Sequence, residues 1–245
     1  MTYSGAILDV DGTVVRGNQA LPGAQKGLTA LGSRSIRRLF VSNNPTRPPE
    51  SYAEKLRAAG IDAAPDEILT AATSTVEYLR RHHAGEPVYL VGDPGVREQL
   101  VRAGFDVCVA GDDAADIDDV EVAVVSIDRS FDYDTLTAAA RTIRGRELPI
   151  VGTDPDAVLG KPHEITRTLA LERLNSDPAE CVVIGDRLDT DIALGAETGM
   201  TTVLVRSGVT DNARLRRADV TPDYVIDTLA DIGPVLDGVA SRYSP

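Results

Sequence analysis

The sequence predicts an α/β protein built on a doubly wound parallel sheet. Short apolar runs alternate with helical patterns, as where GAILDV at 5–10 is followed by a helical pattern at 22–32, and this alternation favours βαβ units. The runs AILDV and CVVIG are almost continuously apolar, as expected of central parallel strands that are buried on both faces. A chain of 245 residues with 42% hydrophobic content can form such a core and a smaller insert.

Further elements follow the same alternation. RRLFVSN predicts a strand before a helix at 49–59, and CVVIGD predicts a strand before a helix at 189–198, which leads into the strand TTVLV. The pattern changes between residues 75 and 157, where VYLVGD, FDVCVAG, VEVAVVSID and LPIVGT alternate with helical segments, including one near 132–144. This region is either more of the same sheet or a separate insert. The acidic run from 112 to 119 is expected to be a solvated loop, because like charges repel.

The charge of the chain excludes several kinds of partner. The net charge is −13 and the sequence pI is about 4.6, so the field around the protein repels nucleic acids and anionic membranes. The 25 basic residues include only three lysines, and 26 of the 38 acids are aspartates. Such a composition predicts adaptation to high internal salt. With no signal-peptide pattern and no long apolar run, we expect a cytoplasmic protein in which Cys108 and Cys181 are reduced structural thiols.

Polar side chains follow four apolar runs at the points where those runs end. Because ligands of open α/β sheets bind beyond the carboxyl ends of the strands, we expect these side chains to form one site. They are Asp9 and Asp11 in DVDGT, Ser42 and Asn43 in SNN, Lys161 in GKP, and Asp186 and Asp191 in GDRLDTD. In isolation, such carboxylates are also common as helix caps.

The chemistry of this set points to phosphoryl transfer. Four clustered carboxylates need compensating positive charge, and Mg²⁺ prefers such oxygen ligands. With Mg²⁺ and Lys161 the formal charge of the site would fall to about −1, and Ser42, Asn43 and backbone amides would hold a phosphate. One aspartate would attack phosphorus, and a carboxylic acid two residues further on would move the proton.

Taken together, DVDGT, SNN, GKP and GDRLDTD resemble, in this order, the four motifs of the haloacid dehalogenase superfamily of phosphatases. NNPTRPPESYAEKLRAAGI and DEILTAATSTVEYL are similar to the branch of the NagD-type and para-nitrophenyl-phosphatase-like enzymes, and the resemblance spans nearly the whole chain. It implies a Rossmann-like catalytic core at 1–74 and 158–245 and an inserted α/β cap domain of the C2 type at 75–157. A homodimer formed through the cap is an expectation from the family.

The resemblance also implies a role for each residue of the motifs. Asp9 would be the nucleophile and a Mg²⁺ ligand, and Asp11 would be the general acid and base, with its carbonyl also on the metal. Asp186 would be the third metal ligand, and Asp191 would orient metal-bound water or Lys161. Lys161 would steady the nucleophile and the phosphate, with Ser42 and Asn43 as phosphate contacts, and Gly12 and Thr13 would shape the turn after the nucleophile.

Two features depart from the family pattern. Pro45 replaces a small hydroxyl residue and removes one backbone donor near the phosphate loop. The connection at 153–161 is much shorter than in relatives, so either the cap is truncated or a segment is missing from the chain.

The expected function is hydrolysis of a small phosphate ester such as a sugar, nucleotide or glycol phosphate. The alternatives are a non-catalytic phospholigand-binding or regulatory protein, and a phosphotransferase or mutase. Other residues have simpler explanations: His163 either touches substrate or begins a helix, His82 and His83 are expected at the surface, and GDPG at 92–95 is expected to form a turn within the cap.

Overall fold

The computed structural model describes residues 2–111, 119–153, 159–196 and 198–244. Contacts between Cα atoms divide the chain into two compact units. The first, here called the core unit, comprises Met1–Ser42, Pro49–Leu69 and Lys161–Pro245. The second, the cap unit, comprises Asn43–Pro48 and Thr70–Gly160.

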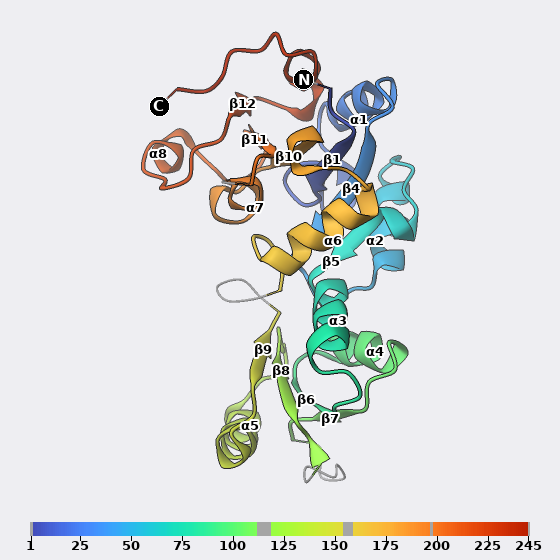
Figure 1. Cartoon of the computed structure of the whole chain (residues 1–245), viewed down its shortest axis with the longest axis vertical. Helices are drawn as coiled ribbons and strands as arrows, with labels where there is room; N and C mark the ends of the chain where they lie inside the picture. Colours follow the sequence, from blue (N-terminus) through green and yellow to red (C-terminus); the bar gives the residue numbers. More distant parts are fainter. Residues whose placement is uncertain (1, 112–118, 154–158, 197, 245) are drawn as a thin grey trace. The chain divides into compact units, whose positions relative to one another are not determined.

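The core unit contains a six-stranded sheet with the order β12-β11-β10-β1-β4-β5 (Figure 1). Neighbouring strands from β12 to β4 pair in parallel. The strands are β1 (Gly5–Asp9), β4 (Arg37–Ser42), β5 (Ile68–Thr70), β10 (Cys181–Gly185), β11 (Thr201–Val205) and β12 (Tyr224–Ile226). The order runs outward in both directions from β1, as in a doubly wound fold. The predicted fold class is therefore confirmed for the core.

Alternating side chains of the core sheet pack against helices on its two faces. Ala6 and Leu8 of β1 belong to one buried cluster with residues of α1 (Ala24–Gly32) and α2 (Pro49–Ala58). Ile7, one residue out of phase, is also buried and points to the opposite face, because successive strand residues alternate. The helix α6 (Glu164–Leu174) contacts β1 and β4. Burial on both faces explains why these strands read as unbroken apolar runs.

Smaller elements complete the core unit. After β1 the chain forms an antiparallel pair, β2 (Val15–Arg16) with β3 (Gln19–Ala20). The remaining elements are short: η1 (Pro65–Glu67), η3 (Pro178–Glu180), the π-helical turn η4 (Leu188–Ile192), α7 (Ala193–Gly195), α8 (Asn212–Leu215), η5 (Leu229–Asp231) and α9 (Gly233–Leu236). The helix expected at 189–198 is thus a π-helical turn followed by one short α-helical turn.

The cap unit has its own parallel sheet, with the order β7-β6-β8-β9. Its elements are α3 (Ala71–His82), β6 (Val88–Val91), α4 (Pro94–Arg102), β7 (Val107–Val109), β8 (Val122–Val125), α5 (Tyr133–Arg146) and β9 (Ile150–Gly152). On one face, Tyr89 and Ala123 of the sheet pack with Ala139 of α5. The strands from β6 to β9 therefore form a separate sheet that does not continue the core sheet, and the unit that contains them begins at Thr70 in its longer segment, not at residue 75.

Several expectations lie outside the described residues. The predicted acidic loop at 112–119 falls almost entirely on residues 112–118, which are not described. The predicted short connection at 153–161 includes residues 154–158, which are not described either. GDPG at 92–95 leads into α4, which begins at Pro94. Cys108 and Cys181 are both free thiols.

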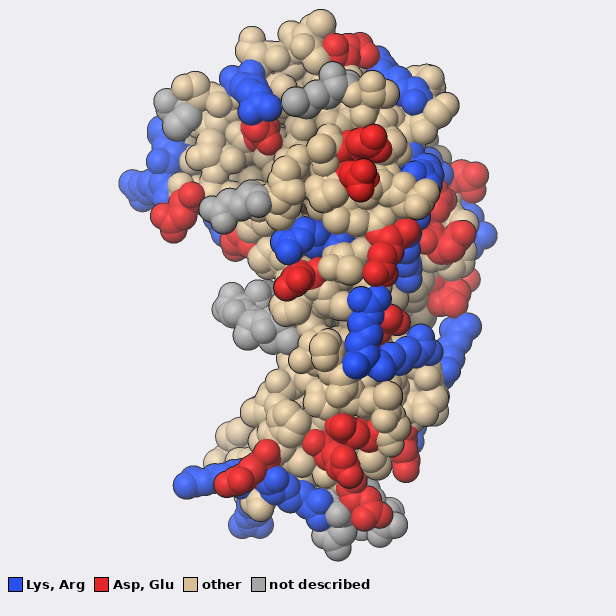
Figure 2. All heavy atoms as spheres, viewed as in Figure 1, with Lys and Arg blue, Asp and Glu red and all other residues tan. Residues whose placement is uncertain are grey.

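Two properties concern the molecule as a whole. Acidic and basic side chains are interspersed on the face shown in Figure 2. Among the described residues, no helix is both long enough and apolar enough to cross a bilayer.

Candidate active site

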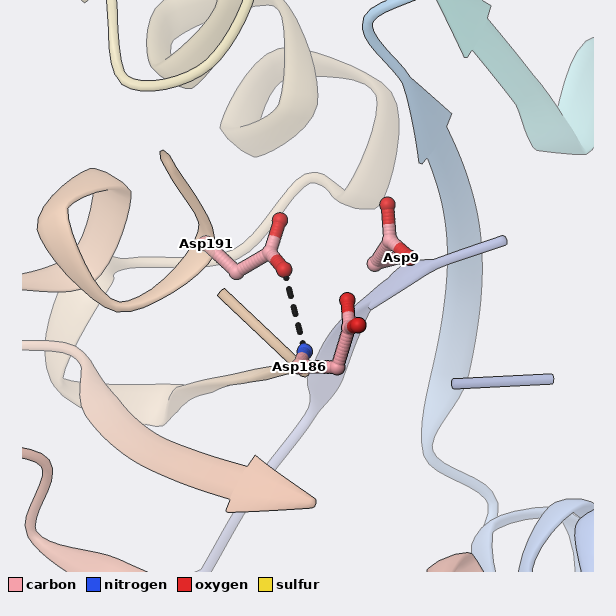
Figure 3. A group of neighbouring side chains, drawn as sticks. All are labelled: Asp9, Asp186 and Asp191. Carbon is pink, nitrogen blue, oxygen red and sulfur yellow. Dashed lines mark hydrogen bonds between the residues drawn. The ribbon is translucent and has the colours of Figure 1, made fainter. Parts of the chain in front are cut away.

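Three strands of the core sheet end in polar residues at the same edge. β1 ends at Asp9, β4 ends at Ser42, and Asp186 follows directly after β10. Because these strands are parallel neighbours, their carboxyl ends lie side by side. Asp9, Asp186 and Asp191 each offer a carboxylate oxygen within 4.8 Å of the others, and Figure 3 shows the three groups directed into the same space. The sheet thus gathers carboxylates that are up to 182 residues apart in sequence.

Lys161 lies at the centre of this group. Its side chain is 3% exposed, and its Nζ lies 2.6 Å from Asp9 Oδ1 and 2.6 Å from Asp191 Oδ1. It also donates a hydrogen bond of 3.0 Å to the carbonyl oxygen of Val41 on β4. Burial alone would lower the pKa of the lysine, but the two carboxylates outweigh burial and raise it. Lys161 is therefore held as a cation by three acceptors.

The Asp9 carboxyl group has a perturbed pKa. Burial is the largest cause of the rise, Lys161 acts to lower the pKa, and the carboxylates of Asp191 and Asp186 raise it, with a net pKa of about 7. One ammonium group beside three carboxylates leaves the site with excess negative charge, so the ion pair with Lys161 does not return the pKa to its usual range. The pKa of Asp186 is also raised, mainly by burial. Protonation or an added cation would relieve this excess.

Asp191 uses both of its oxygens within the protein. Oδ1 faces Lys161. Oδ2 accepts a hydrogen bond of 3.0 Å from the backbone N–H of Asp186 (Figure 3) and another of 3.0 Å from the N–H of Arg187. The side chain also packs against Gly185, where an added Cβ would lie 2.2 Å from Asp191 Cβ. Asp191 therefore fixes both the turn after β10 and the position of Lys161.

Asp186 and Asp9 each keep one oxygen without a protein donor. Asp186 Oδ2 accepts a hydrogen bond of 2.8 Å from the N–H of Val209. Asp186 Oδ1 and Asp9 Oδ2 are buried and have no hydrogen-bond partner among the described residues. Buried carboxylate oxygens normally have a partner, so this pair has the character of a cation site. An added Cβ at Gly208 would lie 1.8 Å from Asp186 Oδ2, which shows how closely the backbone surrounds this carboxylate.

The loop after β1 places Asp11 apart from the three clustered carboxylates. The Asp11 side chain is 53% exposed, and its Oδ1 lies 2.6 Å from Nζ of Lys55 on α2. Gly12 follows with φ of +107°, a left-handed conformation that glycine adopts readily, and its missing side chain leaves room for Asp186. Thr13 is buried. Asp9, the predicted nucleophile, and Asp11, the predicted acid–base residue, thus differ in exposure although they are two residues apart.

The two residues predicted to contact phosphate fall in different units. Ser42 is 7% exposed and donates a hydrogen bond of 2.8 Å to the hydroxyl group of Tyr52 on α2. Asn43 is the first residue of the cap unit, and an added Cβ at Gly160 would lie 2.9 Å from its Oδ1. The role of Asn43 stays a prediction.

Sequence reasoning left several contacts of the site unassigned. Lys55 and Tyr52 lie three residues apart on α2 and contact Asp11 and Ser42, and the scarcity of lysine was the available signal for Lys55. The N–H of Val209 could not have been found from side-chain chemistry. His163 caps α6, because its Nδ1 accepts a hydrogen bond of 3.1 Å from the N–H of Ile165.

Family models match most of the chain. The model of "Haloacid dehalogenase-like hydrolase" matches residues 6–106, and a second model, "HAD-hyrolase-like", matches residues 158–232. An acid sugar phosphatase of Staphylococcus aureus is 30% identical, over 91% of this chain and 93% of that protein. A dihydroxyacetone phosphatase of Corynebacterium glutamicum is 28% identical, over 94% and 91% of the two chains.

Solved structures show the same fold. The p-nitrophenyl phosphatase from Archaeoglobus fulgidus superposes with a TM-score of 0.86 at 29% identity, covering 96% of this chain and all of that chain. NagD from Escherichia coli superposes with a TM-score of 0.83 at 25% identity, covering 95% and 99%. The chain therefore belongs to the haloacid dehalogenase-like hydrolases and is a phosphatase of the branch that contains NagD and the p-nitrophenyl phosphatases.

Proposed function

We propose that the protein is a Mg²⁺-dependent phosphomonoester hydrolase that acts through an aspartyl-phosphate intermediate. Its substrates would be small phosphorylated metabolites, that is sugar, nucleotide or glycol phosphates, with p-nitrophenyl phosphate as an artificial substrate. The observation that carries the proposal is the environment of Asp9. One of its oxygens pairs with Lys161, and the other is buried near Asp186 and has no hydrogen-bond donor in the described part of the chain.

The donor set fits Mg²⁺. Asp9 Oδ2 and Asp186 Oδ1 are hard oxygen donors, both buried and both without a hydrogen-bond partner among the described residues, and Mg²⁺ prefers one or two carboxylates together with water and phosphate. Asp9 and Asp186 would hold the ion together with the main-chain carbonyl of Asp11. Asp191 would remain outside this set, because both of its oxygens already accept from the protein. When bound, the ion would neutralise charge on the phosphoryl group.

The chain's own residues supply the remaining chemistry. An Asp9 oxygen attacks phosphorus, the bond between phosphorus and the ester oxygen breaks, and Asp11 gives its proton to the leaving oxygen. Water then attacks the aspartyl phosphate, Asp11 takes a proton from that water, and the bond between phosphorus and Asp9 breaks to release inorganic phosphate. Lys161 and Ser42 would stabilise the negative oxygens during both steps.

The test is hydrolysis of p-nitrophenyl phosphate in molar KCl with Mg²⁺. Asp9→Asn removes the nucleophile, so we expect kcat to fall on the order of 10³-fold or more, and EDTA should abolish the wild-type activity. Asp189→Asn is the matched control: this aspartate lies in the turn Leu188–Ile192, which also contains Asp191, but it is exposed and pairs with Arg214. Full turnover by Asp9→Asn would refute the assigned nucleophile. Phosphate appearing on an added alcohol, without free phosphate, would show a phosphotransferase.

We further propose that the protein is a cytoplasmic homodimer that associates through the cap unit. The support for the dimer is that four apolar side chains of this unit are exposed, namely Phe131, Tyr133, Leu136 and Ile150. The support for the compartment is the two free thiols, which suit a reducing environment. Light scattering should give twice the chain mass, and Tyr133→Asp should shift the protein to monomer. A monomeric wild type at micromolar concentration would rule the dimer out.

A further inference from the structure

Asp11 is held by a lysine that belongs to none of the four motifs. Lys55 reaches from the last turn of α2 to Asp11, with Nζ 2.6 Å from Oδ1. The two residues are 44 positions apart, so the contact depends on the packing of α2 in the core unit. The lysine side chain is only 12% exposed, although the Asp11 side chain is 53% exposed.

The surroundings of Lys55 distinguish this pair from an ordinary surface ion pair. Exposed pairs contribute little because two long side chains must be ordered in water. Here the ammonium group lies 5.7 Å from the ring centroid of Tyr52, one helical turn earlier, and Tyr52 is buried and accepts a hydrogen bond from Ser42. The helix α2 therefore already restricts the Lys55 side chain, so that forming the ion pair requires little further ordering.

The use of lysine in this chain supports a specific role. The sequence has three lysines and 22 arginines. For two of the three lysines, Nζ lies 2.6 Å from an aspartate oxygen: Lys161 contacts Asp9, the last residue of β1, and Lys55 contacts Asp11 in the loop that follows. The third, Lys26 on α1, is exposed. An ammonium group is a compact charge that can approach a single carboxylate oxygen, whereas the guanidinium fork of arginine is broader.

We infer that Lys55 is a positioning residue that holds the Asp11 carboxyl group in the orientation needed for proton transfer to the leaving oxygen. The inference rests on the proposed function, because it takes Asp11 as the acid–base group. A proton donor matters most when the leaving group is a strong base, since a stable anion departs without help. The effect of Lys55 should therefore grow with the basicity of the leaving group and should leave phosphate binding unchanged.

The experiment compares two aryl phosphates of similar shape, p-nitrophenyl phosphate and phenyl phosphate. Phenolate is the more basic leaving group. In Lys55→Met we expect kcat for phenyl phosphate to fall by about tenfold more than kcat for p-nitrophenyl phosphate, with both KM values and inhibition by vanadate unchanged. Lys55→Arg keeps a cation on α2 but with a broader charged group, so it should recover only part of the loss on phenyl phosphate. Lys26→Met should behave as wild type on both substrates.

The outcomes separate this inference from the proposed function. If the wild type releases no phosphate from either ester, the proposed function fails before any variant is compared. If the wild type is active, equal losses on both esters, no loss on either, or a change confined to KM would each overturn the role of Lys55. Lys55→Gln serves as a second neutral variant, and thermal melting of each variant identifies loss of folding.

Discussion

Lys161 is surrounded by more negative charge than it can neutralise. Its ammonium group faces Asp9 and Asp191, and Asp186 adds a third carboxylate to the same cluster. Burial and this excess of negative charge together raise the pKa of Asp9, so a bound cation would relieve a locally unfavourable arrangement. Binding sites commonly retain such strain, because the ligand that removes it is then held more firmly.

The raised pKa of Asp9 predicts how stability depends on pH in EDTA. Asp9 has a pKa of about 7 when folded, against a reference value of 3.8. Between these values the folded state keeps a proton that the unfolded state has released, so the free energy of unfolding decreases as pH rises from about 4 to about 7. We expect the melting temperature of wild type to fall between pH 5 and pH 8 more steeply than that of Asp9→Asn, as measured by calorimetry.

The same experiment has an internal control. Asp189→Asn removes an exposed carboxylate and should follow the wild-type slope. Adding Mg²⁺ at pH 8 should raise the melting temperature of wild type more than that of Asp9→Asn. If the melting temperatures of wild type and Asp9→Asn decreased equally with pH, the buried Asp9 carboxyl group would not be the cause of the pH dependence.

At the scale of elements, glycines at the ends of three strands and in the loops after them let the backbone approach the carboxylates closely. Gly12 after β1 and Gly208 after β11 both lie where an added Cβ would meet Asp186, and Gly185, the last residue of β10, lies against Asp191. The close approach of backbone to carboxylate lets the N–H of Val209 hold Asp186. These loops therefore fix the carboxylates as firmly as side-chain contacts do.

Gly208→Ala tests the close packing of these loops. The new Cβ would lie 1.8 Å from Asp186 Oδ2, so the carboxylate or the loop must move. We expect a loss of about 1–3 kcal/mol in the free energy of unfolding and a rise of about tenfold or more in the Mg²⁺ concentration for half-maximal activity. Gly32→Ala, on α1 with no atom within 4 Å of the added Cβ, should leave the Mg²⁺ dependence unchanged. A wild-type Mg²⁺ requirement in Gly208→Ala would contradict the proposed place of Asp186 on the metal.

The sequence predicted the long elements with a clear hydrophobic period better than the short ones. Buried strands such as β1 and β10 were evident as apolar runs, and their ends located Asp9 and Asp186. Strands of three residues, such as β5 and β12, are too short to show a period. The contact between Lys55 and Asp11 depends on the rotation of α2 about its axis and on its packing, which a single sequence does not specify.

At the scale of the whole molecule, the net charge of −13 affects both units. The cap unit and the core unit each have a separate sheet and a separate apolar cluster, and acidic side chains are distributed over the face shown in Figure 2. Repulsion among these charges opposes compact folding in dilute buffer.

Added salt should stabilise the protein. At molar KCl the Debye length falls to about 3 Å, so repulsion between exposed acids is screened. We expect the melting temperature and the rate of p-nitrophenyl phosphate hydrolysis to be higher in 2 M KCl than in 0.1 M KCl, at constant free Mg²⁺. A parallel measurement in 2 M sucrose, which is excluded from the protein surface but does not screen charge, serves as the control. Greatest stability and activity in dilute buffer would refute the predicted adaptation to salt.

The central position of β1 has a consequence for how the protein is made. The partner strand β10, in which Cys181 pairs with Gly5, is synthesised about 170 residues after β1. A sheet closed by such distant segments folds slowly, because the chain must lose much entropy before the pairing forms. During translation, Asp9 is made well before Asp186 and Asp191, the carboxylates with which it clusters. Phosphatase activity should therefore emerge only after the segment that contains Asp186 and Asp191 has left the ribosome.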